Sequence, residues 1–325
     1  GRCAAPLAAG AWRASAPRVA LLDRQRMHAT SEESVDVPTS IPKGDRKRMA
    51  MTSPKELMEL KLGFIGWGAM AQAVSLGILR KDLTNPENIM VTDVVPAMME
   101  AAKREGLRTA KTVREIIEWA DVVVVAVKPQ GVGAVLNDVA PLWTSKKILV
   151  SICAGVTIET YLKRLGETAK VVRVMPNTPC LVGEAATAYA GSRSCIEWEL
   201  DLVNGMFGAV GVAHRVPENL LDTVTGLSGS GPAYIYMLIQ AMSDAGVQGG
   251  LPRAVALSLA TQTVLGAAKM VDETGQHPAV LKEAVTSPAG TTIAGVAVLE
   301  KLGFSGIVIQ AVEAARKRSE ELSKS

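Results

Sequence analysis

The sequence predicts a doubly wound α/β sheet followed by an all-helical segment, and two observations support this prediction. Short apolar runs alternate with segments of helical spacing from residue 59 to residue 216. After Pro217 the strand pattern stops, and the rest of the chain is typical of helices only. Regular alternation of strand and helix produces a largely parallel sheet covered by helices. We therefore expect an N-terminal extension over 1–58, a sheet domain over 59–216 and a helical domain over 217–325.

The composition is typical of a globular protein and excludes several functional classes. The 325 residues are 48% hydrophobic, which suffices for one large or two medium cores. The apolar run 122–127 is far shorter than the roughly 18 to 20 residues of a membrane span. A net charge of +3 with 4% aromatic residues provides no basic groove or stacking platform for nucleic acid. The 4 cysteines and 3 histidines lack metal-ligand spacing, so we expect free thiols and no metal.

The first 58 residues differ in kind from the rest. Residues 1–22 are rich in Ala, Arg, Ser and Pro and contain no acidic residue, which is typical of an organellar transit peptide. A cloning or gene-model artefact would have the same composition. Residues 38–48 are linker-like, and Met49 or Met51 is an alternative start. The expected location is therefore either cytoplasmic or organellar.

A glycine-rich turn joins the first predicted strand, 60–65, to the first predicted helix. Gly66 permits a tight turn, Gly68 lets the backbone approach a pyrophosphate, and Ala71 is small enough for the helix to pack on the strand. A phosphate would lie at the helix N-terminus. Because such turns also occur in proteins that bind no nucleotide, the pattern alone is a weak sign of a Rossmann-like domain.

The context of this turn strengthens the prediction. A second strand, 89–92, ends at Asp93, which is 93 − 71 = 22 positions after Ala71. An acid that binds the ribose 2′-hydroxyl is expected about 20 residues on. The β-branched run 121–127 is typical of a central parallel strand. Lys128 follows it at the edge where ligands lie in such sheets, although a solvated lysine is the alternative.

The remaining elements follow from hydrophobic spacing. Further strands are expected at 147–152, 170–175, 186–190 and 211–215, and early helices at 97–105 and 113–119. The second half is expected to form helices at 218–224, 232–246, 252–274, 278–286, 292–302 and 306–322. Helices that are apolar around most of their surface need cover on several sides, so we expect a partner subunit.

The segment 281–300 (LKEAVTSPAGTTIAGVAVLE) joins two helices through a Ser-Pro-Ala-Gly break. Pro288 moves Ser287 away from helical dihedrals, and Gly290 relaxes the backbone. A helix that restarts at Thr291 or Thr292 exposes unpaired N–H groups beside two hydroxyls. These features predict a small anion pocket, whereas an ordinary helix corner with threonine caps is the alternative.

From about residue 62 to residue 322 the chain resembles the Δ1-pyrroline-5-carboxylate reductases. The resemblance is carried by GFIGWGAMA, AVKPQ, SICAGVTI, MPNTP, GLSGSGPAY, GLPR, LGAAKM and the segment 281–300. It implies hydride transfer from NADPH or NADH to the imine carbon of 1-pyrroline-5-carboxylate, giving L-proline. It also implies a homodimer or larger homo-oligomer assembled through the helical domain. No nucleic-acid or membrane partner is expected.

The resemblance also implies roles for individual residues. Thr292 would be catalytic, because its hydroxyl would contact the ring nitrogen of the substrate. The implied substrate-binding residues are Glu218, Ser287, Gly290, Thr291 and Thr292. The implied coenzyme-binding residues are Gly66, Gly68, Ala69, Met70, Ala71, Asp93, Val127, Lys128, Pro129 and Ala154.

Two departures from the family pattern carry predictions. Ala289 stands where the family often has glycine, so a positive φ there would be costly, and we expect the loop to sit slightly differently. Asp93 stands where relatives that use NADPH usually have Ser, Asn or Arg. A carboxylate there favours a free ribose hydroxyl and repels a 2′-phosphate, which predicts that NADH serves at least as well as NADPH. Alternatively, Lys111 or Arg114 holds the phosphate.

Two other functions remain open at this point. A β-hydroxyacid or imine reductase would share a similar pair of domains but usually has a catalytic lysine or aspartate on the central helix. Here the helix 252–274 has charged residues only near its ends. A nicotinamide-binding regulator would retain the coenzyme site without turnover, and replacing Thr292 would distinguish it from an enzyme.

Overall fold

The computed structural model describes residues 59–324. The predictions for the N-terminal extension 1–58, including the transit peptide and the alternative starts at Met49 and Met51, lie outside the described residues.

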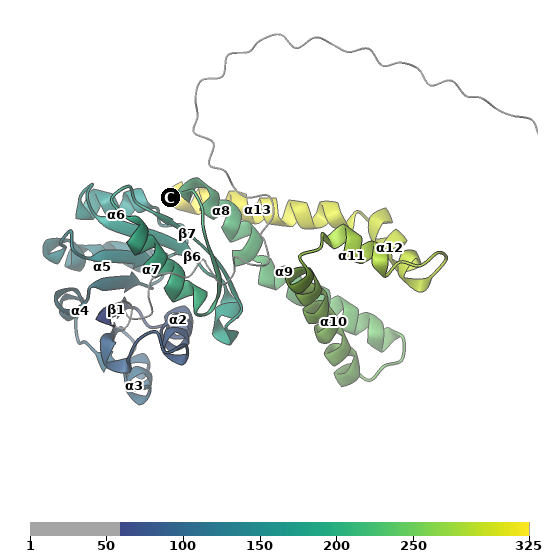
Figure 1. Ribbon diagram of the computed structural model, residues 1–325, viewed down its shortest axis with the longest axis horizontal. Coiled ribbons are helices and arrows are strands. Elements are labelled where there is room, and N and C mark those ends of the chain that lie inside the picture. The colour runs from purple at the N-terminus through teal and green to yellow at the C-terminus, as the bar shows by residue number, and fades with distance from the viewer. Residues whose placement is uncertain (1–58, 325) are drawn as a thin grey trace, which may run out of the picture. The chain divides into compact units, whose positions relative to one another are not determined.

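An eight-stranded sheet forms the first part of the described chain, in the order β3-β2-β1-β4-β5-β6-β7-β8. Figure 1 shows this sheet surrounded by helices. All neighbouring strands are parallel except β6 and β7. The strands are β1 (Leu62–Ile65), β2 (Ile89–Thr92), β3 (Arg108–Thr109), β4 (Val122–Val125), β5 (Ile148–Ser151), β6 (Lys170–Met175), β7 (Ala185–Gly191) and β8 (Gly211–Arg215). Each predicted strand is confirmed to within two residues at either end. Strand β3 was missed because two residues leave no periodic pattern.

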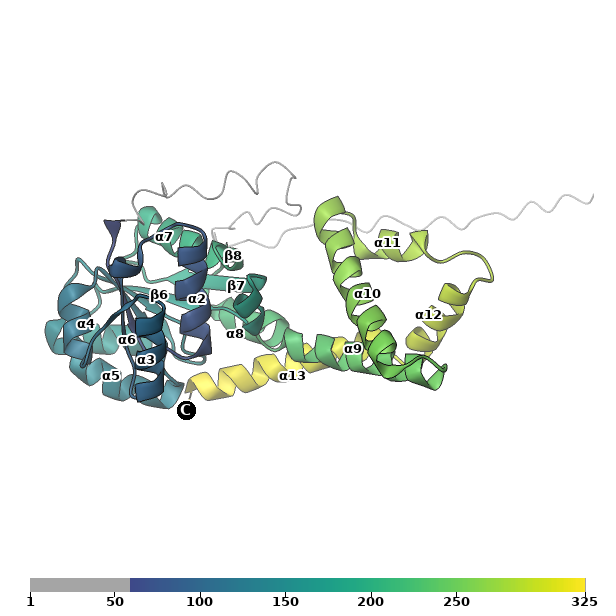
Figure 2. The same cartoon turned by 90° about the horizontal axis from the view of Figure 1, so that it is seen from below.

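Helices cover both faces of the sheet (Figure 2). On one face lie α2 (Ala69–Arg80), α3 (Pro96–Arg104) and α7 (Glu197–Gly208), and on the other α4 (Val113–Trp119), α5 (Val132–Val139) and α6 (Ile158–Leu165). Alternate residues of one strand belong to opposite cores: Phe64 packs in the first and Ile65 in the second. The four valines of β4 are all 0% exposed, as expected of a central strand buried on both faces.

After β8 the described chain is helical. The helices are α8 (Leu221–Val224), α9 (Gly231–Gln248), α10 (Arg253–Thr274), α11 (Pro278–Ala284), α12 (Thr291–Lys301) and α13 (Phe304–Lys324). The predicted helices are confirmed in order, with one difference at the start. The stretch expected as a helix over 218–224 is a 3-10 turn, Glu218–Leu220, followed by α8 and then a π turn, Thr225–Gly229.

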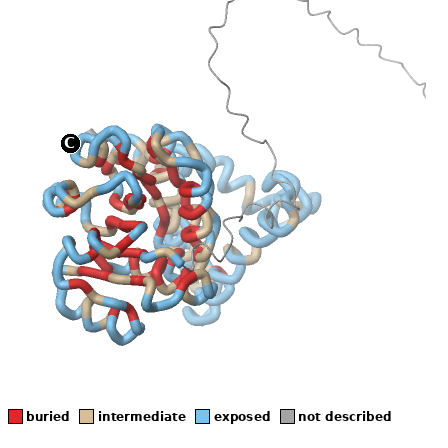
Figure 3. Tube along the Cα trace, turned by 60° about the vertical axis from the view of Figure 1, so that its left-hand side comes forward, coloured by how far each residue is buried: buried red, intermediate tan, exposed pale blue. Residues whose placement is uncertain are grey.

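The helices after the sheet domain are largely exposed (Figure 3). Large apolar side chains are among the exposed residues from α9 to the end of α12. Met237 is 72% exposed and Leu302 is 67% exposed, whereas Ala256 and Ala260 are the residues of α10 that are buried. Helix α10 also has the length and composition to cross a membrane, and 11% of its most apolar 18-residue stretch is buried. The uninterrupted apolar runs of the sequence did not indicate this. These exposed faces require a covering surface that residues 59–324 do not supply.

Candidate active site

The carboxyl ends of four parallel strands meet at one edge of the sheet. Ile65 of β1 pairs with Thr92 of β2 and with Val125 of β4, and Val125 pairs in turn with Ser151 of β5. The turns that leave these strands are therefore neighbours. The strand order reverses between β1 and β4, and such a reversal opens the crevice in which α/β sheets bind ligands.

The turn after β1 depends on glycine at two positions. Gly66 has a φ of 87°, and a Cβ there would lie 2.8 Å from the carbonyl oxygen of Ala126. Its N–H donates to the carbonyl of Thr92 at 2.8 Å, which ties the turn to β2. Gly68 has extended backbone, and a Cβ there would meet nothing within 4 Å. The side of Gly68 that faces away from the protein is thus open to a ligand.

The N-terminus of α2 follows this turn and provides free donors. Gly68 is the N-cap and no side chain caps the helix. In the part of the chain that the structure describes, the N–H groups of Ala69, Met70 and Ala71 have no protein acceptor, and Gln72 makes the first intrahelical bond, to Gly68 at 3.0 Å. Free N–H groups at a helix N-terminus attract phosphate. The residues present therefore fit the pyrophosphate of a dinucleotide.

Asp93 has a structural role that the sequence did not reveal. Its Oδ2 accepts a hydrogen bond from the N–H of Trp67 at 2.7 Å, and its Oδ1 accepts one from Val95 at 2.8 Å. The carboxylate thereby holds the glycine-rich turn in place. Each carboxylate oxygen has a further lone pair for a ribose hydroxyl. Of the alternative phosphate ligands, Arg114 pairs with Glu118 at 3.1 Å.

The other predicted coenzyme residues lie at the same edge. Val127 and Lys128 leave β4, and Pro129 begins the next 3-10 turn. The Sγ of Cys153 donates to the carbonyl of Val127 at 3.2 Å, so the exits of β4 and β5 are tied together. Ala154 follows and is exposed. Burial raises the pKa of the Cys153 thiol, which indicates a structural thiol rather than a reactive one.

The second predicted cluster is the break between α11 and α12. The N–H of Gly290 donates to the carbonyl of Ser287 at 3.0 Å, which closes a turn. Ala289 lies inside the turn with a φ of 56°, in the left-handed region. A Cβ on Gly290 would collide with Ser287 Oγ. Ala289 itself thus adopts the positive φ that is costly for a residue other than glycine.

The free N–H groups of this break begin after Gly290. Gly290 is one of the implied substrate-binding residues, but its N–H is used within the turn. Among the described residues, the N–H groups of Thr291, Thr292 and Ile293 have no protein acceptor, because the first bond of α12 is from Ala294 to Gly290. These three N–H groups lie beside the hydroxyls of Thr291 and Thr292, both of which are exposed.

Glu218 lies in a different environment from this loop. Its Oε1 accepts from the N–H of Ile158, the first residue of α6, at 2.7 Å and from Arg173 at 3.4 Å. In the described chain, no hydrogen bond or ion pair joins Glu218 or the coenzyme edge to residues 287–292. The structure thus groups the coenzyme residues at one edge and the loop residues in another part of the same chain.

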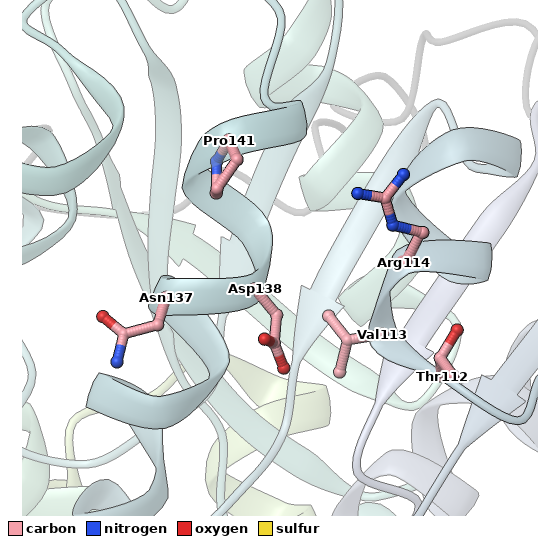
Figure 4. A pocket seen from close by; sticks show the side chains of 6 residues that line it. All are labelled: Thr112, Val113, Arg114, Asn137, Asp138 and Pro141. Atoms are coloured by element: carbon pink, nitrogen blue, oxygen red, sulfur yellow. The ribbon is translucent and has the colours of Figure 1, made fainter.

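Two surface hollows lie outside both clusters. One of about 310 Å³ lies between α4 and α5 and is lined by Thr112, Val113, Arg114, Asn137, Asp138 and Pro141 (Figure 4). The other, about 320 Å³, lies beside α6 and includes Glu218. The first hollow thus includes Arg114, the alternative phosphate ligand, and the second includes Glu218.

Comparisons with known proteins match both halves. Residues 218–322 match the family described as pyrroline-5-carboxylate reductase dimerisation, and residues 61–155 match the family described as NADP oxidoreductase, coenzyme F420-dependent. The pyrroline-5-carboxylate reductase of Methanosarcina acetivorans is 46% identical over 265 residues, covering 81% of this chain and 98% of that protein. The enzyme of Pisum sativum is 44% identical over 262 residues, covering 81% and 96%.

Solved structures agree with these matches. The Plasmodium falciparum pyrroline carboxylate reductase with NADP bound superimposes with a TM-score of 0.74 at 37% identity, covering 82% of this chain and 98% of that one. A pyrroline-5-carboxylate reductase from Coxiella burnetii has a TM-score of 0.78 at 36% identity, covering 82% and 99%. The resemblance inferred from the motifs is confirmed. The chain belongs to the pyrroline-5-carboxylate reductase family, with a Rossmann-type NADP-binding domain followed by a helical dimerisation domain.

Proposed function

We propose that this chain reduces 1-pyrroline-5-carboxylate to L-proline with NADPH or NADH, the last step of proline biosynthesis. The observation that carries the proposal is a pair of complementary sites. One is an edge with free helix N–H groups for a dinucleotide, and the other is a loop with three free N–H groups beside two threonine hydroxyls. A small cyclic imino acid needs both an anion site and a donor for its ring nitrogen.

At the loop, the N–H groups of Thr291, Thr292 and Ile293 bind the substrate carboxylate. The Thr292 hydroxyl donates to the ring nitrogen, which orients the imine and stabilises the nitrogen as it gains electron density. Ser287 and Gly290 keep the turn in shape through their backbone hydrogen bond. Bound NAD(P)H would supply the hydride to the imine carbon, and the ring nitrogen takes up one proton from solvent, so that proline and NAD(P)+ are formed.

At the sheet edge, residues 66–71 hold the pyrophosphate and Asp93 accepts a hydrogen bond from the ribose. Val127, Lys128, Pro129 and Ala154 lie farther along the edge, beside the nicotinamide half. The fold of residues 59–216 thus presents the hydride donor, and the helical residues from 217 present the acceptor. Glu218 stands at the boundary between them, where we assign it to substrate binding.

We further propose that the loop of one protomer serves the coenzyme edge of its partner in a homodimer or larger assembly. The exposed apolar faces of α9 to α12, within the region that matches the dimerisation family, support a second copy as their cover. Burial against a second copy also explains why α10 is long and apolar, without requiring that it cross a membrane. The absence of a hydrogen bond between loop and edge in the described chain agrees with this arrangement.

Mixed oligomers test the shared site. Gly68→Asp places a carboxylate in the open space meant for a phosphate without a clash, and Thr292→Ala removes the loop hydroxyl. Each variant alone should be nearly inactive. After subunit exchange, a dimer with one intact shared site should restore up to about a quarter of wild-type activity on statistical grounds. If exchanged mixtures stay inactive although exchange is shown by mass, the site lies within one protomer.

The primary test is turnover by the wild-type protein. Oxidation of NAD(P)H with 1-pyrroline-5-carboxylate should match the proline formed, mole for mole, and β-hydroxy acids supplied with NAD(P)+ should give no coenzyme reduction. A protein that binds coenzyme but forms no proline would contradict the proposal.

For the N-terminal residues 1–58 we propose a targeting segment, on the basis of the acid-free composition of residues 1–22. A fluorescent protein fused after residue 58 should accumulate in an organelle. Diffuse cytoplasmic fluorescence would contradict the targeting role but would not bear on the proposed activity.

A further inference from the structure

A buried arginine lies between two carboxylates where the sheet meets the helices. Arg173 on β6 is 5% exposed, with Glu218 Oε1 at 3.4 Å and Asp222 Oδ1 at 3.5 Å. Both carboxylates come from the stretch that follows β8. A buried cation requires such partners, because an unpaired charge in a protein interior is costly.

Asp222 also binds the far end of the chain. Its Oδ1 accepts a hydrogen bond from Ser319 Oγ at 2.7 Å, across 97 residues, and Ser323 Oγ lies at 3.5 Å. Ser319 is 6% exposed on α13. A short bond to a buried carboxylate is stronger than one between neutral groups. The last turns of α13 are therefore held against α8 (Figure 1).

The path of α13 is determined by a close backbone approach. Gly226 lies in the π turn, and a Cβ there would be 2.5 Å from the carbonyl oxygen of Val312 and 3.0 Å from the N–H nitrogen of Arg316. Only glycine permits this approach. The hydroxyl of Tyr234 donates toward the carbonyls of Gly226 and Ala311, both at 3.4 Å. Backbone contact and side-chain bonds thus direct the same helix toward the sheet.

The end of α13 reaches the coenzyme edge. Leu322 lies beside Gly155, where an added Cβ would be 3.7 Å from Leu322 Cβ. Gly155 has a φ of 74° and lies in the turn between β5 and α6, next to Ala154. The far end of this turn is held by Glu218, which accepts from Ile158 at 2.7 Å. Arg173 is therefore linked to the turn in two ways. Its partner Glu218 binds the far end of the turn, and its partner Asp222 holds α13, whose Leu322 lies beside Gly155.

We infer that Asp222 and Ser319 are positioning residues that hold the turn 153–157 in the shape that receives the coenzyme. The inference rests on the proposed function, because that function places the coenzyme beside Ala154. Since α13 belongs to the region that matches the dimerisation family, the same bond links the assembly domain to the coenzyme edge. Neither residue needs to touch coenzyme or substrate for this role.

The test compares Ser319→Ala with Ser305→Ala, an exposed serine on the same helix without a hydrogen bond of this kind. Ser319→Ala should raise the coenzyme Kd by about three- to tenfold, the range expected for one lost hydrogen bond. The kcat at saturating coenzyme should change less than twofold, and Ser319→Thr should restore the Kd. Hydrogen exchange should become faster in residues 153–158.

Several outcomes would overturn the inference. A lower Tm with a coenzyme Kd equal to that of Ser305→Ala would assign the bond to stability alone. If hydrogen exchange in residues 153–158 is unchanged in Ser319→Ala, α13 does not hold the turn in place. If Ser319→Ala does not fold, Asp222→Asn keeps the shape but replaces the charged acceptor by a weaker neutral one, so it should also raise the coenzyme Kd relative to Ser305→Ala. Because the Kd requires no turnover, a wild-type protein that binds coenzyme but makes no proline contradicts the proposed function alone.

Discussion

Replacing Ala289 by glycine should stabilise the protein, although the same change elsewhere in the helical region should do the opposite. Ala289 has a φ of 56°, and a non-glycine residue in that region costs about 1 to 2 kcal/mol. Glycine removes this strain but adds roughly 0.4 to 1 kcal/mol of conformational entropy to the unfolded chain. The balance is a gain of about 0.5 to 1 kcal/mol in the free energy of unfolding.

Equilibrium denaturation at constant protein concentration measures this gain, with Ala297→Gly as the matched control. Ala297 lies within α12, where glycine should cost about 0.5 to 1 kcal/mol relative to alanine. The two substitutions should therefore have opposite signs. The kcat/KM for the imino acid should be retained in Ala289→Gly, because the loop already has the shape that glycine prefers. Equal destabilisation by both variants would refute the left-handed conformation of Ala289.

Three further predictions concern the loop, the coenzyme and a buried thiol. Gly290→Ala puts a methyl group against Ser287 Oγ, so kcat/KM for the imino acid should fall more than about tenfold while the coenzyme Kd stays constant; a shift in the coenzyme Kd instead would contradict the assignment of the loop. Asp93 predicts that NADH is used at least as well as NADPH, and a preference for NADPH above about tenfold in kcat/KM, or about 1.4 kcal/mol, would reject this. Burial raises the pKa of Cys180 to about 11 from an ordinary value of 9.0, so its contribution to stability is complete below pH 9 and is lost as the pH rises toward 11. Denaturation between pH 8 and pH 11 should show unfolding free energy falling by up to about 1.4 kcal/mol per pH unit for this group, and Cys180→Ala should have a shallower slope; identical slopes would contradict an un-ionised thiol.

The sequence predicted the elements of the fold where local pattern and tertiary burial coincide. The valines of β4 are buried on both faces, so their composition alone identifies a central strand. The π turn at 225–229 was not predictable, because its cause is the close approach of α13, some 90 residues later in the chain. The strand β3 is too short to show periodicity.

The sequence predicts which residues form the candidate site but not the hydrogen bonds that shape it. Gly66 and Gly68 can be predicted because a phosphate-binding turn needs glycine at those positions. By contrast, the bond from Trp67 to Asp93 depends on the neighbouring strands β1 and β2, and the bond that uses the Gly290 N–H depends on how a left-handed Ala289 closes the turn. The link from Asp222 to Ser319 spans 97 residues and has no signature in the sequence.

The most direct test of the central claim is to separate coenzyme binding from turnover in Thr292→Ala, with Thr291→Ala as the neighbouring control. Because we propose the Thr292 hydroxyl as the donor to the ring nitrogen, Thr292→Ala should lose most of its kcat for proline formation, by about 10² or more. Its coenzyme Kd should match wild type, and Thr291→Ala should retain most of the kcat. Proline formation by Thr292→Ala at the wild-type rate, or loss of coenzyme binding together with turnover, would contradict the account.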